Sequence, residues 1–67
     1  IKNIKKGDLL FFATSKNSRK VNHVGIVTTI TGTNVSFLHA SSSKGVMISN
    51  LSQRYWYFAF VQARRVL

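Results

Sequence analysis

The sequence has no cysteine and only one acidic residue, Asp8, in 67 residues. Without cysteine, neither a disulfide nor a thiolate metal site can stabilise the fold. No stretch reaches the roughly 20 apolar residues of a membrane-spanning helix, and the first residues, IKNIKKGD, do not have the pattern of a secretory signal peptide. We therefore expect a single small domain that is stabilised by its apolar residues alone.

The shortness of the chain limits its stability. A domain of this size buries only about 60% of the surface that its unfolded chain exposes. We therefore expect marginal stability, or a fold that is completed by more chain. Because the sequence starts on Ile1 rather than on Met, we also expect it to be a piece of something longer.

Positive charge is abundant where negative charge is scarce. Ten Lys and Arg residues give a formal net charge of +9, which attracts polyanions such as nucleic acid, anionic lipid or an acidic cell-wall polymer. A merely solvated surface is the other reading, since the basic residues are dispersed and form no helical stripe. They are Lys2, Lys5, Lys6, Lys16, Arg19, Lys20, Lys44, Arg54, Arg64 and Arg65.

The apolar pattern predicts short β-strands, because β-branched and aromatic residues occur in runs divided by polar turns. We predict a helical turn within residues 50–57, capped by Asn50 or Ser52. The fold class is therefore mainly β, an antiparallel sheet of about five strands without an internal domain boundary. The predicted strands are LLFFA (9–13), HVGIVTTI (23–30), VSFLHA (35–40), KGVMIS (44–49) and FAFVQARRVL (58–67).

The two histidines, His23 and His39, lie on consecutive strands of a predicted hairpin. They share a face only if the register has the right parity, and a three-residue loop centred on Gly32 provides it, whereas a two-residue loop would separate them. In that register Gly25 lies opposite His39 and Ser41 opposite His23. The missing side chain at Gly25 would let the ring of His39 lean toward His23.

If the histidines share a face, one imidazole can fix the tautomer of the other, which then acts as a base near neutral pH. Rival readings are two histidines without chemistry and a zinc site. Zinc needs three or four ligands, and the chain offers two histidines and the distant Asp8. A serine nucleophile from residues 41–43 is a further alternative, although these serines lack a sharp elbow.

Several segments, in order, carry a family resemblance: GDLLFF, HVGIV, FLHASSSKGVMISNL, and YW followed by ARRVL. From Gly7 to Leu67 the chain resembles the C-terminal half of the NlpC/P60 cysteine peptidases, most of all the murein endopeptidase lipoproteins of Gram-negative bacteria. The resemblance implies the β half of an α+β, papain-like fold. Residues 1–67 would then form a single partial domain.

The resemblance also implies a function. A Cys, His and polar-residue set would hydrolyse peptide bonds of the peptidoglycan stem or crosslink, outside the cytoplasm in the periplasm or cell envelope. His23 matches the general base and His39 the residue that orients it, while no cofactor and no metal are implied. The implied partners are peptidoglycan peptides.

The sequence departs from the family pattern at the nucleophile. The family's cysteine lies in an Asp-Cys-Ser-Gly type motif at the start of a helix upstream of the GDL strand, and this chain has no such motif. Three expectations follow: a fragment of a longer enzyme, a chain completed by a cysteine-bearing N-terminal segment or partner, or a degenerate domain retained for binding. In each case we expect the chain alone to be inactive.

Two further readings concern binding. A non-catalytic basic module could hold an acidic cell-wall polymer. Binding of single-stranded nucleic acid is weaker, since it needs Phe11, Phe12, Phe37 and the YWYF cluster as stacking rings rather than as core. We also expect an apolar sheet face that the missing helical half would cover, and hence self-association.

Overall fold

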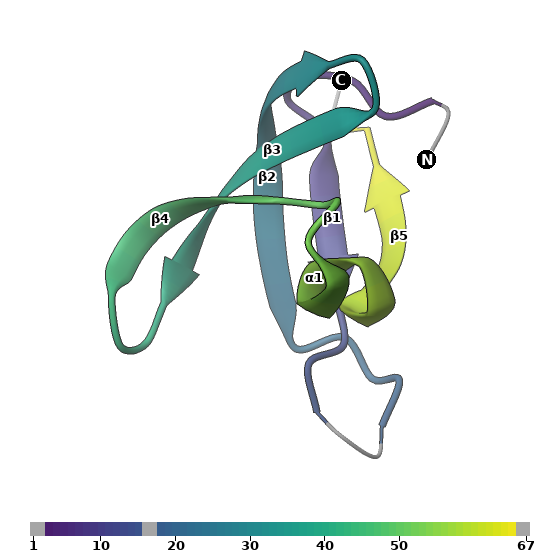
Figure 1. Ribbon diagram of the computed structural model, residues 1–67. Coiled ribbons are helices and arrows are strands. Elements are labelled where there is room, and N and C mark those ends of the chain that lie inside the picture. The colour runs from purple at the N-terminus through teal and green to yellow at the C-terminus, as the bar shows by residue number, and fades with distance from the viewer. Residues whose placement is uncertain (1–2, 16–17, 66–67) are drawn as a thin grey trace.

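The structure is a computed structural model that describes residues 3–15 and 18–65. It contains one antiparallel sheet in the strand order β4-β3-β2-β1-β5, with one short helix between β4 and β5 (Figure 1). The mainly β architecture predicted from the sequence is confirmed. The elements are β1 (Leu9–Phe12), β2 (His23–Thr31), β3 (Asn34–Ser41), β4 (Gly45–Asn50), α1 (Arg54–Ala59) and β5 (Phe60–Arg64).

Helix α1 begins later than predicted. Its N-cap is Gln53, whose side chain makes no capping hydrogen bond. The predicted caps are wrong because the side-chain oxygen of Asn50 instead accepts hydrogen bonds from the backbone N–H and the hydroxyl of Ser52, closing an Asx turn before the helix. The last strand likewise starts at Phe60, and its predicted end, residues 66–67, lies outside the described residues.

The hydrophobic core lies on one face of the sheet, which we call the closed face because α1 packs on it. Alternation along β1 and β3 sends every second side chain to this side. Leu10, Phe12 and Phe37 are completely buried there, and Trp56 of α1 packs against them. The other core residues are Val27, Val35, Leu51 and Ala59.

The burial of an aromatic ring decides whether it is available to stack on a nucleic-acid base, as the nucleic-acid-binding hypothesis requires. Phe12 and Phe37 have no exposed surface, so neither ring is free to stack on a base. Among the remaining candidate rings, Trp56 packs against the core, whereas Tyr55 and Phe58 are exposed.

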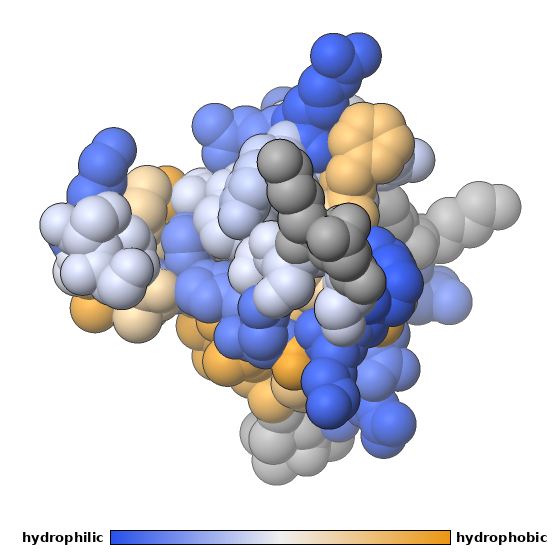
Figure 2. Space-filling model, turned by 90° about the horizontal axis from the view of Figure 1, so that it is seen from below, coloured by the Kyte–Doolittle hydropathy of each residue, from blue (hydrophilic) through white to orange (hydrophobic). Residues whose placement is uncertain are grey.

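The opposite face of the sheet, which we call the open face, is apolar as well. Leu9, Ile26, Leu38 and Ile48 are cross-strand partners in a row across four strands. The side chain of Ile48 is 60% exposed, and that of Val46 beside it 71%. Hydrophobic colour gathers in the lower part of Figure 2, on the side of the sheet away from α1.

The β2–β3 hairpin pairs Gly25 with His39, as in the register of the right parity considered above, but its loop is shorter than three residues. Its loop has two residues, Gly32 and Thr33, because Thr31 pairs with Asn34, and Gly32 has the positive φ of +61° that a type II′ turn requires at its first central position. Of the two loop lengths that the sequence left open, the structure therefore has the two-residue loop.

A β-bulge restores the parity that the short loop alone would lose. Thr29 pairs with Ser36, but Val27 pairs with Phe37, so Thr28 is an extra residue on β2. The Thr28 hydroxyl donates a hydrogen bond to the carbonyl oxygen of Ser36, at 3.2 Å. Beyond the bulge the register has shifted by one residue, and Gly25 lies opposite His39 as predicted.

No helix among the described residues is both long and apolar enough to cross a bilayer.

Candidate active site

Both histidines project from the closed face of the sheet and meet. Nε2 of His23 lies 3.0 Å from Nδ1 of His39, within hydrogen-bond distance. His23 is the first residue of β2 and is partly exposed, whereas His39 lies within β3 and is only 6% exposed. The predicted placement of the two rings on one face is confirmed.

Gly25 is needed for a reason other than the predicted one. A Cβ added there would lie 2.7 Å from Cδ2 of Phe37 and 3.2 Å from the carbonyl oxygen of Leu38. The ring that fills the space over Gly25 is thus Phe37, not His39 as predicted. Phe37 in turn packs beside His39, with 5.0 Å between the ring centroids, so Gly25 acts on the histidine pair through Phe37.

A third polar group, which the sequence did not reveal, extends the pair. The hydroxyl oxygen of Ser49, on β4, lies 2.8 Å from Nε2 of His39. Ser49 is only 7% exposed. His23, His39 and Ser49 therefore form a continuous hydrogen-bonded row across three neighbouring strands.

Trp56 of α1 packs against both histidines of this row. Its ring is stacked on His23, with a centroid distance of 5.5 Å and an interplanar angle of 25°. It meets His39 edge-on at 4.7 Å. The indole therefore restricts the rotation of both imidazoles.

The position of His23 is fixed by the residue before it. The backbone N–H of Asn22 donates to the carbonyl oxygen of Phe12, and its side-chain oxygen accepts hydrogen bonds from the backbone N–H and the hydroxyl of Thr14. These bonds join the two ends of the segment that connects β1 to β2. His23 therefore enters β2 from an anchored backbone.

The electrostatics of the pair favour a neutral His39. Burial lowers the pKa of His39, and the neighbouring His23 lowers it further. A neutral imidazole has one nitrogen that accepts a hydrogen bond, so Nδ1 of His39 can accept a hydrogen bond from Nε2–H of His23. Nδ1 of His23 makes no hydrogen bond with the described residues and is the nitrogen that remains for proton transfer.

The histidines line an open groove of about 370 Å³. Ser41 and Ser42 are also on its wall, but the Ser41 hydroxyl accepts hydrogen bonds from the backbone N–H groups of Ser43 and Lys44 in the β3–β4 turn. That role in the turn gives Ser41 none of the features of an activated nucleophile. The remaining lining residues are Thr14, Ala40, Met47, Tyr55 and Trp56.

The only carboxylate is engaged elsewhere. Asp8 accepts hydrogen bonds from Arg65 and from the backbone N–H of Lys5, and these bonds hold the pKa of Asp8 below its usual range. It precedes β1, whereas His23 pairs with Phe12 at the other end of that strand. Within residues 3–15 and 18–65, no three His, Cys, Asp or Glu residues are grouped as metal ligands.

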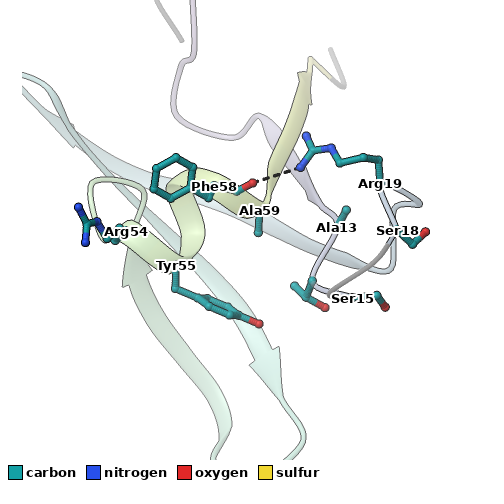
Figure 3. A pocket seen from close by; sticks show the side chains of 9 residues that line it. Ala13, Ser15, Ser18, Arg19, Arg54, Tyr55, Phe58 and Ala59 are labelled. Carbon is teal, nitrogen blue, oxygen red and sulfur yellow. Dashed lines mark hydrogen bonds between the residues drawn. The ribbon is translucent and has the colours of Figure 1, made fainter.

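A second cavity, of about 520 Å³, adjoins the groove and shares Thr14 and Tyr55 with it. Arg19 and Arg54 lie on its wall, and Figure 3 shows Arg19 reaching the carbonyl oxygen of Phe58 at the end of α1. No carboxylate is among its described lining residues. Any charge that this cavity presents is therefore positive.

Comparison with known proteins identifies the family of this chain. The sequence model of the NlpC/P60 family matches residues 1–65. The chain belongs to the NlpC/P60 family. It is 50% identical over 60 residues to the "Probable endopeptidase NlpC" of Escherichia coli strain K12, covering 90% of this chain and 36% of that protein.

Two further relatives are matched over a similar part of their length. The "Probable endopeptidase NlpC homolog" of Haemophilus influenzae is 45% identical over 64 residues, 96% of this chain and 30% of its own length. The "Murein DD-endopeptidase MepS/Murein LD-carboxypeptidase" of Escherichia coli strain K12 is 43% identical over 65 residues, 97% and 31%. The chain thus spans about a third of the length of the curated relatives it matches.

Proposed function

We propose that this NlpC/P60 chain supplies the histidine half of a cysteine-type peptidoglycan endopeptidase. His23 is the general base, His39 orients it, and the thiol comes from a segment outside these 67 residues. The observation that carries the proposal is the 3.0 Å contact between Nε2 of His23 and Nδ1 of His39. This contact leaves Nδ1 of His23 to receive a proton from the thiol.

The chemistry follows from this arrangement. Nδ1 of His23 takes the proton of a neighbouring thiol, and the thiolate attacks the carbonyl carbon of the scissile peptide bond. The imidazolium then returns the proton to the leaving amine, and water hydrolyses the acyl intermediate. His39 stabilises the imidazolium by accepting the hydrogen bond from Nε2 of His23.

The proposed substrates are peptide bonds of the peptidoglycan stem or crosslink. Support comes from the names of the relatives, which describe a murein DD-endopeptidase and a peptidoglycan DL-endopeptidase. An enzyme acting on that polymer works outside the cytoplasm, in the periplasm or cell envelope. The groove of about 370 Å³ along the two histidines is where the peptide would lie.

The chain by itself should not hydrolyse these bonds. It contains no cysteine, and a base without a nucleophile forms no acyl intermediate. Addition of the cysteine-bearing segment, joined or mixed, is expected to produce activity.

The decisive experiment is a turnover assay on muropeptides with the completed protein. We expect His23→Ala to lower kcat by about 10³-fold or more. His39→Ala should cost less, because water can partly replace an orienting residue. Thr33→Ala, at the exposed hairpin tip, is the matched control and should leave turnover unchanged.

Unchanged turnover in His23→Ala would refute the assignment of the base. A well-folded completed protein without turnover would point to a second candidate, a non-catalytic module that binds an acidic cell-wall polymer. The net charge of +9 and the cavity walled by Arg19 and Arg54 favour this candidate. Salt-dependent binding to the isolated polymer, lost in Arg54→Ala, is its signature.

A further inference from the structure

Ser49 is the one buried serine of β4, and its position in the sheet explains its contact with His39. It pairs with Phe37 on β3, while His39 pairs with Met47. Ser49 and His39 are therefore diagonal neighbours on the closed face. Because a hydroxyl is costly to bury without a hydrogen bond, the 2.8 Å contact with Nε2 of His39 satisfies both groups.

The hydrogen bonds between His23, His39 and Ser49 can all point in one of two directions, depending on the tautomers of the histidines. In the first, Nε2–H of His23 donates to Nδ1 of His39, and Nε2–H of His39 donates to the Ser49 hydroxyl oxygen. In the second, Ser49 donates to His39, Nδ1–H of His39 donates to His23, and the proton of a neutral His23 lies on Nδ1. Only the first direction leaves Nδ1 of His23 able to accept a proton.

Formation of an imidazolium at His23 selects the first direction. Both nitrogens of His23 then carry protons, so Nδ1 of His39 has to accept and Nε2 of His39 has to be protonated. That N–H is buried and needs an acceptor. Because Trp56 covers His39 edge-on at 4.7 Å, the Ser49 oxygen is the acceptor that the described structure provides.

We propose that Ser49 is a positioning residue that holds His39 in the Nε2–H tautomer, with its Nδ1 turned as an acceptor toward His23. The tautomer is a property of this chain and can be measured on it directly. Its catalytic consequence rests on the function proposed above.

The primary test is nitrogen-15 NMR of the histidine rings in the chain as it is. We expect Nε2 of His39 to have the nitrogen-15 chemical shift of a protonated nitrogen and its Nδ1 that of an unprotonated nitrogen. The Nε2–H should exchange slowly with water. In Ser49→Ala the two nitrogen shifts should move toward those of a tautomer mixture, and the Nε2–H signal should exchange faster with water. Ser49→Thr keeps the hydroxyl and should restore the wild-type pattern.

Ser36→Ala, on β3 and away from the histidines, is the matched control for loss of a serine hydroxyl and should leave the ring signals unchanged. The backbone spectrum reports whether each variant keeps the fold. Two results would overturn the proposal: a wild-type His39 protonated at Nδ1, or an unchanged His39 pattern in a folded Ser49→Ala chain. If Ser49→Ala does not fold, the wild-type tautomer and the Ser49→Thr pattern still decide.

A second arm uses the protein completed with its thiol. Ser49→Ala should lower kcat by up to about 100-fold, because a misoriented base loses that much, with little change in KM. If the completed protein has no turnover at all, the proposed function fails while the NMR result for Ser49 stands. Full turnover in Ser49→Ala would reject the positioning role while the endopeptidase assignment stands.

Discussion

Both faces of the sheet carry apolar side chains but differ in what those side chains contact. The closed face packs Phe12 and Phe37 against α1 and buries them completely. The open face leaves Ile48 and Val46 more than half exposed. The histidine row belongs to the closed face, so the packing that stabilises the chain also sets the geometry of the site.

The largest difference should appear when one large residue is truncated on each face. Phe37→Ala removes a fully buried ring and should cost about 3–5 kcal/mol of the free energy of unfolding, enough to unfold a domain of this size. Ile48→Ala, the matched truncation on the open face, should cost well under 1 kcal/mol. Urea denaturation followed by circular dichroism measures both, and equal losses would remove the distinction between the faces.

Gly25→Ala tests how tightly the closed face is packed, through its effect on the free energy of unfolding. The added Cβ would meet the Phe37 ring at 2.7 Å and the Leu38 carbonyl oxygen at 3.2 Å, so we expect a loss of about 1–3 kcal/mol from overpacking. Gly45→Ala, where no atom lies within 4 Å but φ is +73°, separates backbone strain from steric clash. A stability of Gly25→Ala equal to wild type would show that Phe37 can move away without cost.

The pH dependence of stability tests the burial of His39. Its pKa is lowered in the folded state, so below its ordinary value of 6.5 the unfolded chain takes up a proton that the folded chain resists. The free energy of unfolding should therefore fall as the pH decreases through 6.5 and level off below the folded-state pKa. His39→Gln should remove this contribution, and an unchanged pH profile in that variant would contradict it.

The smallest effect on stability, and the clearest on association, is expected at the open face. Val46→Lys with Ile48→Lys should disrupt self-association through that face, because contiguous exposed apolar residues favour contact between molecules. Sedimentation velocity of both forms, with Thr33→Lys as a control for added charge, measures the change. A wild-type chain that sediments as a monomer at all concentrations would argue against this use of the face.

Strand alternation was enough to predict most of the sheet, whereas the shared face of the two histidines was predicted only for a register of the right parity. The sequence could not show that the parity comes from a bulge at Thr28 together with a two-residue loop, because a bulge depends on the pairing of both strands. The contact of Ser49 with His39 was not predicted from the sequence, for a related reason. In KGVMIS the apolar Val46 and Ile48 point outward and the serine inward, which reverses the usual pattern and becomes visible only once β4 is paired with β3.

The structure shows where the two histidines lie, whereas their catalytic roles are proposed. The register brings His23 and His39 together, but the identity of the base depends on where a thiol is placed beside Nδ1. In the proposed function, that thiol comes from a segment outside these 67 residues. Family membership and the contact between the rings support the assignment, and the muropeptide assay is its test.

The bulge at Thr28 makes the face on which His23 lies depend on the length of β2. An in-frame deletion of that one codon would leave the composition almost unaltered and the turn intact. Yet every residue of β2 before the bulge would exchange faces relative to β3, sending His23 outward and Val24 and Ile26 toward Trp56. One threonine that touches neither histidine thereby determines on which face of the sheet His23 lies.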